Sequence, residues 1–555
     1  MNWQKNLILA AIGVVVWLLV IEWSEFQAKE EAKEPSFVDQ GVQAIFEQPG
    51  SNNTQVTYTP PAPKDDRSNF TKAPAVEQKI VTITTDVIKV TINTLGGDIV
   101  ETKLLNHLDK MPNKGGKPIS ILTNSNGNKF IAQSGLIGNN ATDRDGGKVR
   151  PTFTTSATSY QLNEGDQNLD VDFIYNHDGV EIIKRFEFKP SDYQIGIRYI
   201  VRNLTPEPWS ANVYGLFMRD SHQPEMESSP GMAPYLGAAL HEEDKNYSKY
   251  DFSDINDEEV KTTIKGGWLA FVQHYFVSAW VPPQESKNRY LLRKGPGDTY
   301  LMSVTGKTIN VVPGSTEEYK IDLYVGPKNQ DVLKELSEYL DLTIDYGFLW
   351  MLAKPIFAAL QIIQGFLTNW GWSIILLTIF IKILLYPLSA ASLKSMAKMR
   401  TLQPEMARIK ELYGDDRQKA GQEQMALFKK HQVNPLGGCF PMLLQMPVFI
   451  ALYWVLSESV EIRHSPWIFW IQDLSAKDPL FILPLIMGAS MFLMQKLQPA
   501  PTDPMQAKVF QLMPIMFTFF FMMFPAGLVL YWTVNNLLSI LQQWYVNRQI
   551  AAAAK

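Results

Sequence analysis

The sequence predicts a membrane protein with an N-terminal signal anchor, a large all-β domain and a C-terminal α-helical core of five membrane spans. Three patterns carry this prediction. An apolar stretch opens the chain, short runs of alternating apolar and polar residues fill its middle, and long apolar stretches follow one another towards its end. The 555 residues are enough for two or three domains that each bury a core.

Composition and motifs exclude several classes of protein. The net charge of -5 argues against nucleic acid as the main partner. The one cysteine, Cys439, rules out an internal disulfide framework and a cysteine-based zinc cluster. No His-Glu-x-x-His, Gly-x-Ser-x-Gly or P-loop pattern occurs, so we expect no catalytic residues, no metal and no cofactor.

The signal anchor is expected at residues 1–23. Residues 7–21 are apolar, and Trp3 and Trp23 would lie at the two membrane interfaces. No cleavage site of small residues follows, which favours an uncleaved anchor over a cleaved signal peptide. Residues 24–78 are first charged and then rich in proline, so we expect a disordered periplasmic linker.

The all-β domain is expected at residues 79–330. Apolar and polar residues alternate with the period of a half-buried strand, and turn residues such as Gly96 and Gly97 separate the runs. Runs of this kind lie at 81–85, 88–92, 171–175, 182–188 and 319–325. The pattern predicts a large antiparallel β-sandwich.

Helical periodicity begins near Asp331. We expect connecting helices at residues 331–365, of which 356–366, opened by Pro355, would be amphipathic and lie along the membrane surface. A core of five spans would then occupy 366–546. The expected spans are 366–388, 436–456, 480–494, 509–524 and 526–544. The two of 15 and 16 residues would cover about 24 Å of a hydrocarbon layer of about 30 Å, which indicates a locally thin bilayer.

Basic residues predict the orientation. Residues 390–434, expected to form a helical hairpin broken at Gly414, hold nine lysines and arginines, whereas the next long loop holds only Arg463 and Lys477. The hairpin is therefore expected in the cytoplasm, together with both chain termini, and the β domain outside it. The hairpin could be a solvated surface or a docking site for a ribosome or a substrate.

A charge inside a span is the clearest sign of a functional site. Lys382 is the only charged residue of the stretch 366–388, about 9 Å from its end by helical rise. Its stem could snorkel to the interface, or its ammonium could face a wet cavity. Thr378 shares its helix face, with a hydroxyl that could instead bond its own helix.

Polar residues in other spans could extend the same lining. Gln445 lies in the second span of the core, and Tyr531, Trp532 and Asn535 lie in the last. Together they outline a polar and aromatic groove, although single amides of this kind, including Asn536, often only join helices.

Several motifs resemble the YidC family of membrane-protein insertases. The most extended is NPLGGCFPMLLQMPVF at 434–449. The others are YPL at 386–388, SMAKMR at 395–400, LQP at 402–404, DPMQ at 503–506 and FPAGLVLYW at 524–532. The resemblance covers about residues 354–545, and the long β domain matches the form of double-membraned bacteria.

The resemblance implies a five-helix core around a hydrophilic groove that opens to cytoplasm and lipid. Lys382 matches a basic residue that is more often arginine in the family, Thr378 matches a function-sensitive position, and Trp532 replaces a more usual tyrosine. Lysine keeps the charge but loses the bidentate fork. The β domain would resemble a β-supersandwich of the sugar-mutarotase type without evident catalysis.

The resemblance also implies a function and partners. The protein would insert and help fold inner-membrane proteins, alone or with the Sec translocon, and it would contact nascent membrane segments, lipid and, through the hairpin, the ribosome. No enzyme activity is expected. Two alternatives from other classes are a small-solute transporter, which would need paired half-helices, and a membrane-anchored periplasmic carbohydrate-active enzyme, which would need an acid pair in a cleft.

Overall fold

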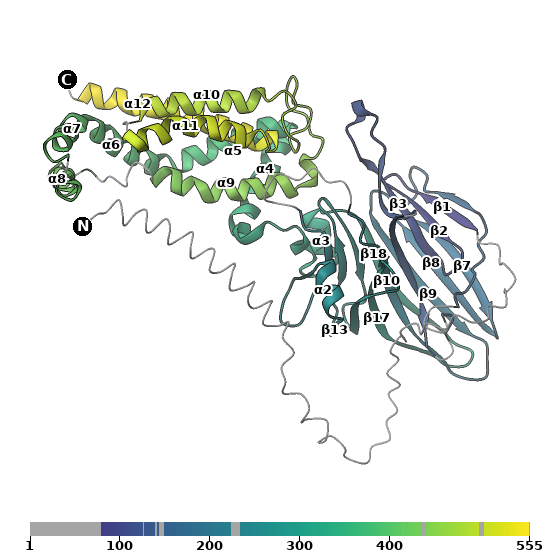
Figure 1. Ribbon diagram of the computed structural model, residues 1–555. Coiled ribbons are helices and arrows are strands. Elements are labelled where there is room, and N and C mark those ends of the chain that lie inside the picture. The colour runs from purple at the N-terminus through teal and green to yellow at the C-terminus, as the bar shows by residue number, and fades with distance from the viewer. Residues whose placement is uncertain are drawn as a thin grey trace, which may run out of the picture.

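A β-sandwich and a bundle of helices lie side by side in the computed structural model (Figure 1). The structure describes residues 79–125, 127–138, 141–143, 149–223, 234–414, 416–431, 433, 440–498 and 504–553. The predicted anchor and linker, as well as Cys439, lie outside the described residues.

Two antiparallel-dominated sheets form the sandwich, as the sequence predicted. The ten-stranded sheet has the order β13-β16-β17-β10-β5-β4-β3-β2-β1-β6, and the eight-stranded sheet has the order β12-β11-β14-β15-β18-β9-β8-β7. The strands of the first sheet are β1 (Ile80–Thr84), β2 (Ile88–Asn93), β3 (Asp98–Leu108), β4 (Pro118–Ser125), β5 (Asn128–Ile137), β6 (Ser159–Gln161), β10 (Trp209–Arg219), β13 (Val260–Lys265), β16 (Lys287–Lys294) and β17 (Tyr300–Val311). Those of the second are β7 (Leu169–His177), β8 (Val180–Phe188), β9 (Gln194–Asn203), β11 (Gly237–Leu240), β12 (Ser248–Tyr250), β14 (Leu269–Val272), β15 (Phe276–Val281) and β18 (Thr316–Pro327).

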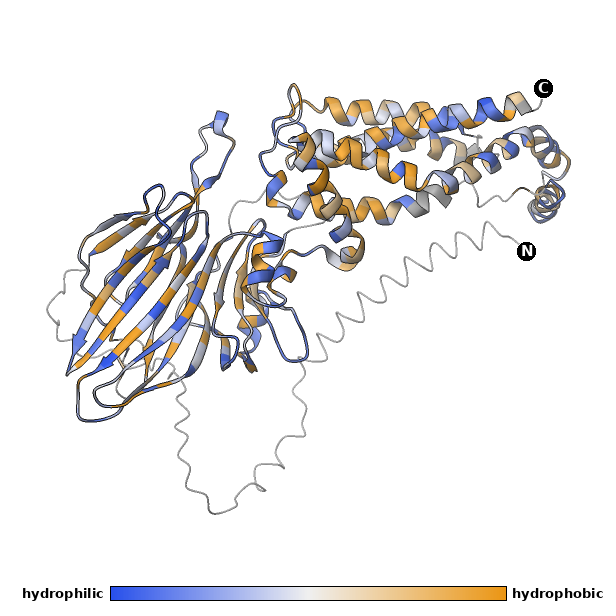
Figure 2. Ribbon diagram, turned by 180° about the vertical axis from the view of Figure 1, so that it is seen from behind, coloured by the Kyte–Doolittle hydropathy of each residue, from blue (hydrophilic) through white to orange (hydrophobic). Residues whose placement is uncertain are grey.

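The alternation of residues explains the strands. Along β8, every second side chain from Val180 to Phe188 is buried, and Ile182 pairs with Val201 of β9. Figure 2 shows the same alternation of hydrophobic and hydrophilic positions along the strands. Each sheet therefore turns an apolar face towards the other sheet.

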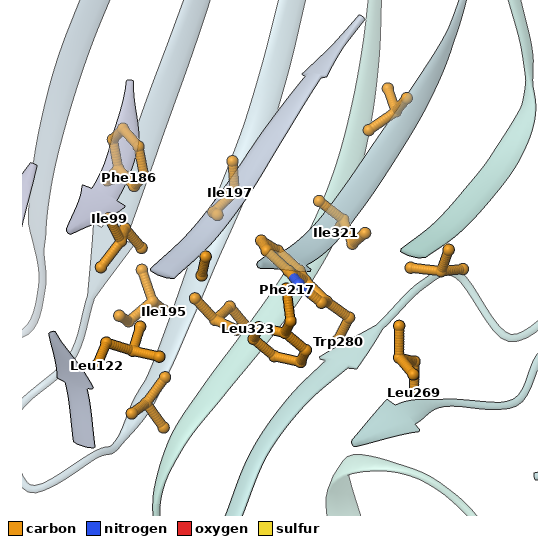
Figure 3. Close-up of a cluster of buried hydrophobic side chains, with 14 of the residues drawn as sticks. Ile99, Leu122, Phe186, Ile195, Ile197, Phe217, Leu269, Trp280, Ile321 and Leu323 are labelled. Carbon is orange, nitrogen blue, oxygen red and sulfur yellow. The ribbon is translucent and has the colours of Figure 1, made fainter. Parts of the chain in front are cut away.

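The core between the sheets is aromatic and aliphatic (Figure 3). Trp280 of β15 and Phe217 of β10 have ring centroids 5.7 Å apart, and both side chains are fully buried. Gly215 of β10 makes room for this packing, because a Cβ atom there would lie 2.6 Å from Cδ2 of Trp280.

The chain becomes helical within a residue of the predicted position. The helix α3 (Gln330–Leu336) is capped by Asn329, whose side chain accepts from the backbone N–H groups of Asp331 and Val332. The helix α4 (Trp350–Leu367) begins five residues before Pro355, which was wrongly expected to open it. At this interior position proline lacks the N–H that would bond to the backbone oxygen of Met351.

A short helix, α2 (Phe252–Asp257), belongs to the sandwich, and the helices after α4 form the bundle. They are α5 (Trp370–Leu384), α6 (Tyr386–Thr401), α7 (Gln403–Leu412), α8 (Arg417–Lys430), α9 (Phe440–Glu458), α10 (Ile482–Leu497), α11 (Pro504–Phe521) and α12 (Ala526–Ala553). The axes of α5 and α6 differ by 68°. Pro387, the second residue of α6, accounts for the break, because it lacks the N–H that would bond to the backbone oxygen of Ile383 and its ring crowds that oxygen.

Length and hydropathy single out fewer spans than the sequence predicted. Within the described residues, one helix, at Gly347–Leu367, could cross a bilayer by itself, and the bent pair α5 and α6 qualifies if taken as one span. The apolar helices Ile482–Leu497 and Ala507–Phe521 are shorter. A helix of 16 residues rises only about 24 Å, so these helices would match a thinned bilayer.

The sandwich and the bundle share a packed junction. One apolar cluster joins Ala270 of β14 and Val277 of β15 to Leu333 of α3 and Leu452 of α9. Nε2 of His274 lies 2.7 Å from the backbone oxygen of Ser457 at the end of α9. Polar and apolar contacts together therefore hold the bundle against the sandwich.

Candidate functional site

Three helices bring four of the predicted site residues together. Lys382 lies in the last turn of α5, Gln445 in the first half of α9, and Tyr531 and Asn535 in the first half of α12. Tyr531 and Asn535 are four residues apart and so share one helix face. The site thus depends on residues far apart in the sequence.

The ammonium of Lys382 is hydrogen-bonded inside the bundle. Its Nζ donates to Oγ of Ser539 at 2.8 Å and approaches Oε1 of Gln445 at 3.5 Å. Both acceptors are neutral. No carboxylate forms an ion pair with Lys382 in the part of the chain that the structure describes.

The amide of Gln445 connects Lys382 to α12. Its Nε2 donates to the hydroxyl oxygen of Tyr531 at 3.1 Å and also to Oδ1 of Asn535. Because the amide nitrogen faces α12, the amide oxygen is left to face Lys382. Lys382, Gln445, Tyr531, Asn535 and Ser539 form one connected set, which we name the polar seam.

Thr378 and Trp532 lie outside the polar seam. The hydroxyl of Thr378 donates to the backbone oxygen of Ile374 at 2.6 Å, and the residue is 1% exposed. Trp532 packs edge-on against Phe449, with ring centroids 4.7 Å apart. These two predicted site residues thus belong to the packing around the seam. Whether they act on a substrate remains a prediction.

Asn536 joins two helices instead of lining the seam. Its Nδ2 donates to Oγ of Ser490 in α10 at 3.1 Å, and both residues are buried. Neighbouring amides of α12 therefore face opposite partners, Asn535 towards α9 and Asn536 towards α10.

The sequence reasoning missed Ser539, the nearest partner of Lys382. A signal was present, since Ser539 lies four residues after Asn535 and eight after Tyr531, on the same face of α12. Gln542 extends this face, and its Nε2 donates to Oγ of Ser389 in α6 at 2.7 Å. The polar seam therefore continues along α12 towards α6.

The sandwich holds a second cluster of charged side chains. Arg150 forms ion pairs with Asp98 at 2.5 Å and Asp143 at 3.2 Å, and Nζ of Lys184 donates to the backbone oxygen of Gly97 at 2.8 Å. Burial raises the pKa of Asp143 to about 6 and lowers the pKa of Lys184 to about 7.

This cluster is inside the domain. Lys184 is 0% exposed and Asp143 is 1% exposed. An acid pair that hydrolyses a sugar must reach its substrate, so Asp98 and Asp143 do not have the placement that a carbohydrate-active site needs. Their contacts instead tie the chain around Arg150 to the first strands.

Comparison with known proteins assigns both parts of the chain. Residues 80–359 match the family described as YidC periplasmic domain, and residues 362–553 match the family described as 60Kd inner membrane protein. The membrane protein insertase YidC of Cellvibrio japonicus is 50% identical over 556 residues, covering 100% of this chain and 99% of the relative. The chain belongs to the YidC family of membrane protein insertases.

Two other YidC insertases also match the whole chain. The insertases of Pseudomonas syringae and Stutzerimonas stutzeri are 47% and 46% identical, each over 100% of this chain and 99% and 100% of their own lengths. A YidC insertase crystal structure with the first transmembrane domain resolved is 19% identical, covers 85% of this chain and 93% of its own, and has a TM-score of 0.38. As a YidC-family member, the chain is an inner-membrane protein with a periplasmic domain, and the family is not an enzyme family by name.

Proposed function

We propose that this YidC-family chain inserts membrane proteins by receiving their polar parts at the polar seam. The groove would be lined by Lys382, Gln445, Tyr531 and Asn535, with Thr378 and Trp532 packed around them. The observation that carries the proposal is a lysine inside an apolar bundle whose ammonium is bonded only to neutral side chains among the described residues. Placing such a charge in a membrane costs at least about 2.5 kcal/mol, which favours a functional role over chance.

The energetics need no nucleotide. A polar lining lowers the free energy needed to carry a short hydrophilic tail into the membrane. The apolar part of the client, the protein being inserted, would then move sideways into lipid, and each Å² that it buries contributes about 25 cal/mol. Exposed side chains of α11, including Met516 and Phe519, offer an apolar surface beside this route.

The proposed topology follows from charge. The anchor at 1–23 and the core at 366–546 would place both termini in the cytoplasm, and the linker at 24–78 and sandwich at 79–330 in the periplasm. The short helices α7 and α8 support a cytoplasmic hairpin, since they carry many basic residues and share only a small apolar cluster that includes Met406 and Phe428. The helix α4, which begins in the connecting segment 331–365, would lie at the membrane surface.

Partners are proposed on the same basis. The clients would be nascent membrane-protein segments, in contact with lipid, with or without the Sec translocon. The basic hairpin of α7 and α8 would approach the ribosome through charge. The bent pair α5 and α6 is one interrupted helix within the described residues, whereas a solute transporter of the inverted-repeat type would need two.

The test is reconstitution of the purified chain into liposomes. A single-span protein with a short translocated tail is added without nucleotide, and protection of the tail from protease is measured. Protection that depends on the chain supports autonomous insertion. A tail that stays accessible, although the chain is folded and correctly oriented, contradicts it, and adding Sec components then tests joint insertion.

A further inference from the structure

The hydrogen-bonding capacity of Lys382 is only partly used. A lysine ammonium has three N–H donors and no acceptor. Two of them are directed to Oγ of Ser539 at 2.8 Å and Oε1 of Gln445 at 3.5 Å. The structure records no third acceptor among the residues it describes, so one N–H of Lys382 is open to an acceptor from outside the chain.

The hydroxyl of Ser539 can only accept from Lys382. A serine hydroxyl has one hydrogen, and that of Ser539 is donated to the backbone oxygen of Asn535 at 2.8 Å. Because a backbone oxygen of a helix does not move independently, this bond directs the lone pairs of Oγ away from the helix and towards Lys382. Ser539 is thus prepared to hold a cation.

Gln445, like Ser539, is oriented to accept a hydrogen bond from Lys382. Both recorded bonds of its Nε2, to Tyr531 and to Asn535, hold the amide so that Oε1 points to Lys382. Every group of the polar seam that contacts the ammonium therefore presents an oxygen to it, and none presents a competing donor.

We propose that Ser539 is a positioning residue that holds the Lys382 ammonium so that its remaining N–H meets one acceptor of the client, such as a single carboxylate. The proposal rests on the proposed insertase function and adds to it the number of acceptors that the site takes. A lysine stem is long and flexible, and ordering it costs free energy when a partner binds. Fixing the ammonium beforehand removes part of that cost.

The test compares two clients in proteoliposomes containing the full chain. They are single-span proteins whose translocated tails differ only by Asp or Asn at one position. We expect Ser539→Ala to reduce insertion of the Asp tail about tenfold, equivalent to about 1.4 kcal/mol, and to leave the Asn tail nearly unchanged. Ser539→Thr keeps the acceptor and should restore insertion.

Ser490→Ala is the matched control. It removes a buried hydroxyl from α10 that accepts from Asn536 and lies outside the polar seam. The ratio of Asp-tail to Asn-tail insertion should therefore equal that of the parent protein. A Ser539→Ala variant that inserts both tails like the parent protein overturns the proposal. Equal loss of both tails without rescue by Ser539→Thr also overturns it, since that result indicates a structural role.

A second measurement is independent of insertion. Labelling of Lys382 by a small amine-reactive reagent is measured by mass spectrometry. It should increase in Ser539→Ala, because losing an acceptor disfavours the protonated ammonium and the reagent modifies the neutral amine. In Ser539→Thr it should return to the level of the parent protein. Unchanged labelling overturns the proposed contact. If labelling changes as expected while the parent protein inserts neither tail, the contact stands and the insertase proposal fails.

Discussion

The ammonium of Lys328 lies 2.7 Å from the carboxylate of Glu458, in an ion pair that joins the sandwich to the end of α9. The two side chains are 2% and 6% exposed. Lys328 follows directly after β18, while Glu458 is the last residue of α9. The junction between the two domains therefore contains a charge pair withdrawn from water.

Breaking this pair should strongly destabilise the junction. Glu458→Ala leaves the Lys328 ammonium buried without its counter-charge, and we expect a loss of about 3–5 kcal/mol. The measurement is thermal unfolding of the purified full chain in detergent, combined with protease sensitivity of the segment between α3 and α4.

An exposed pair provides the control for Glu458→Ala. Lys265 and Glu285 form an ion pair with side chains that are 63% and 92% exposed. Glu285→Ala should change the unfolding temperature far less, because water screens an exposed ion pair. If the two variants lowered the unfolding temperature equally, the buried ion pair would stabilise the protein no more than the exposed one.

Packing at Gly215 can be tested by adding one methyl group. Gly215→Ala would place Cβ 2.6 Å from Cδ2 of Trp280, closer than atoms can pack. We expect a loss of about 1–3 kcal/mol from the displaced ring, seen as a lower unfolding temperature and altered tryptophan fluorescence. Gly421→Ala in α8, where no atom lies within 4 Å of the added Cβ, should not destabilise the chain.

Acid should weaken the sandwich through His107. Burial, together with the charges of Arg463 and His464, lowers the pKa of His107 from 6.5 to about 4. The folded protein then keeps His107 neutral while the unfolded chain takes up a proton, so this residue's contribution is full above pH 6.5 and falls as the pH drops towards about 4.

His107→Phe isolates that contribution to acid sensitivity. Phenylalanine retains a ring against Phe276, whose centroid is 5.6 Å from that of His107, but it cannot be protonated. Unfolding temperatures of the full chain should therefore fall less between neutral and acidic pH in this variant. His177→Gln, at a side chain that is 41% exposed, serves as the control and should retain the parent's pH dependence.

The charge of Lys382 should matter more than its exact shape. Lys382→Ala and Lys382→Glu should reduce insertion of an acidic-tailed client, Lys382→Glu more so because it repels the tail, while Lys382→Arg should retain most of it. Protease protection of the tail in liposomes is the measurement. Normal insertion by both the alanine and glutamate variants would rule out attraction of charge at this site.

Most of the fold could be predicted because its signals are local. Alternation along residues such as 182–188 states which side of a strand is buried, and β8 has that alternation in the structure. The same reasoning did not predict the helical break near Tyr386, since the stretch 366–388 was expected to be one span and the structure bends it by 68° before Pro387. Apolar residues continue through the bend and therefore suggest one span, whereas Pro387 interrupts the helix itself.

The candidate site could be predicted only in part. Lys382, Gln445, Tyr531 and Asn535 were noticed because polar residues stand out in apolar helices. Ser539 was not, since serine is common in helices of every kind, and Thr378 and Trp532 were grouped with the others although they pack elsewhere. Side-chain type alone does not state which face of a helix meets which neighbour.

The sequence by itself determined the division into sandwich and helices, because hydrophobic periodicity acts between residues that are close along the chain. It also determined that a charge must lie among apolar helices. Only the tertiary structure decided that Lys382 meets Ser539, 157 residues away, and that Lys328 meets Glu458, 130 residues away. Such pairs form only when whole helices and strands pack, since the packing sets the register and rotation that bring the two side chains together.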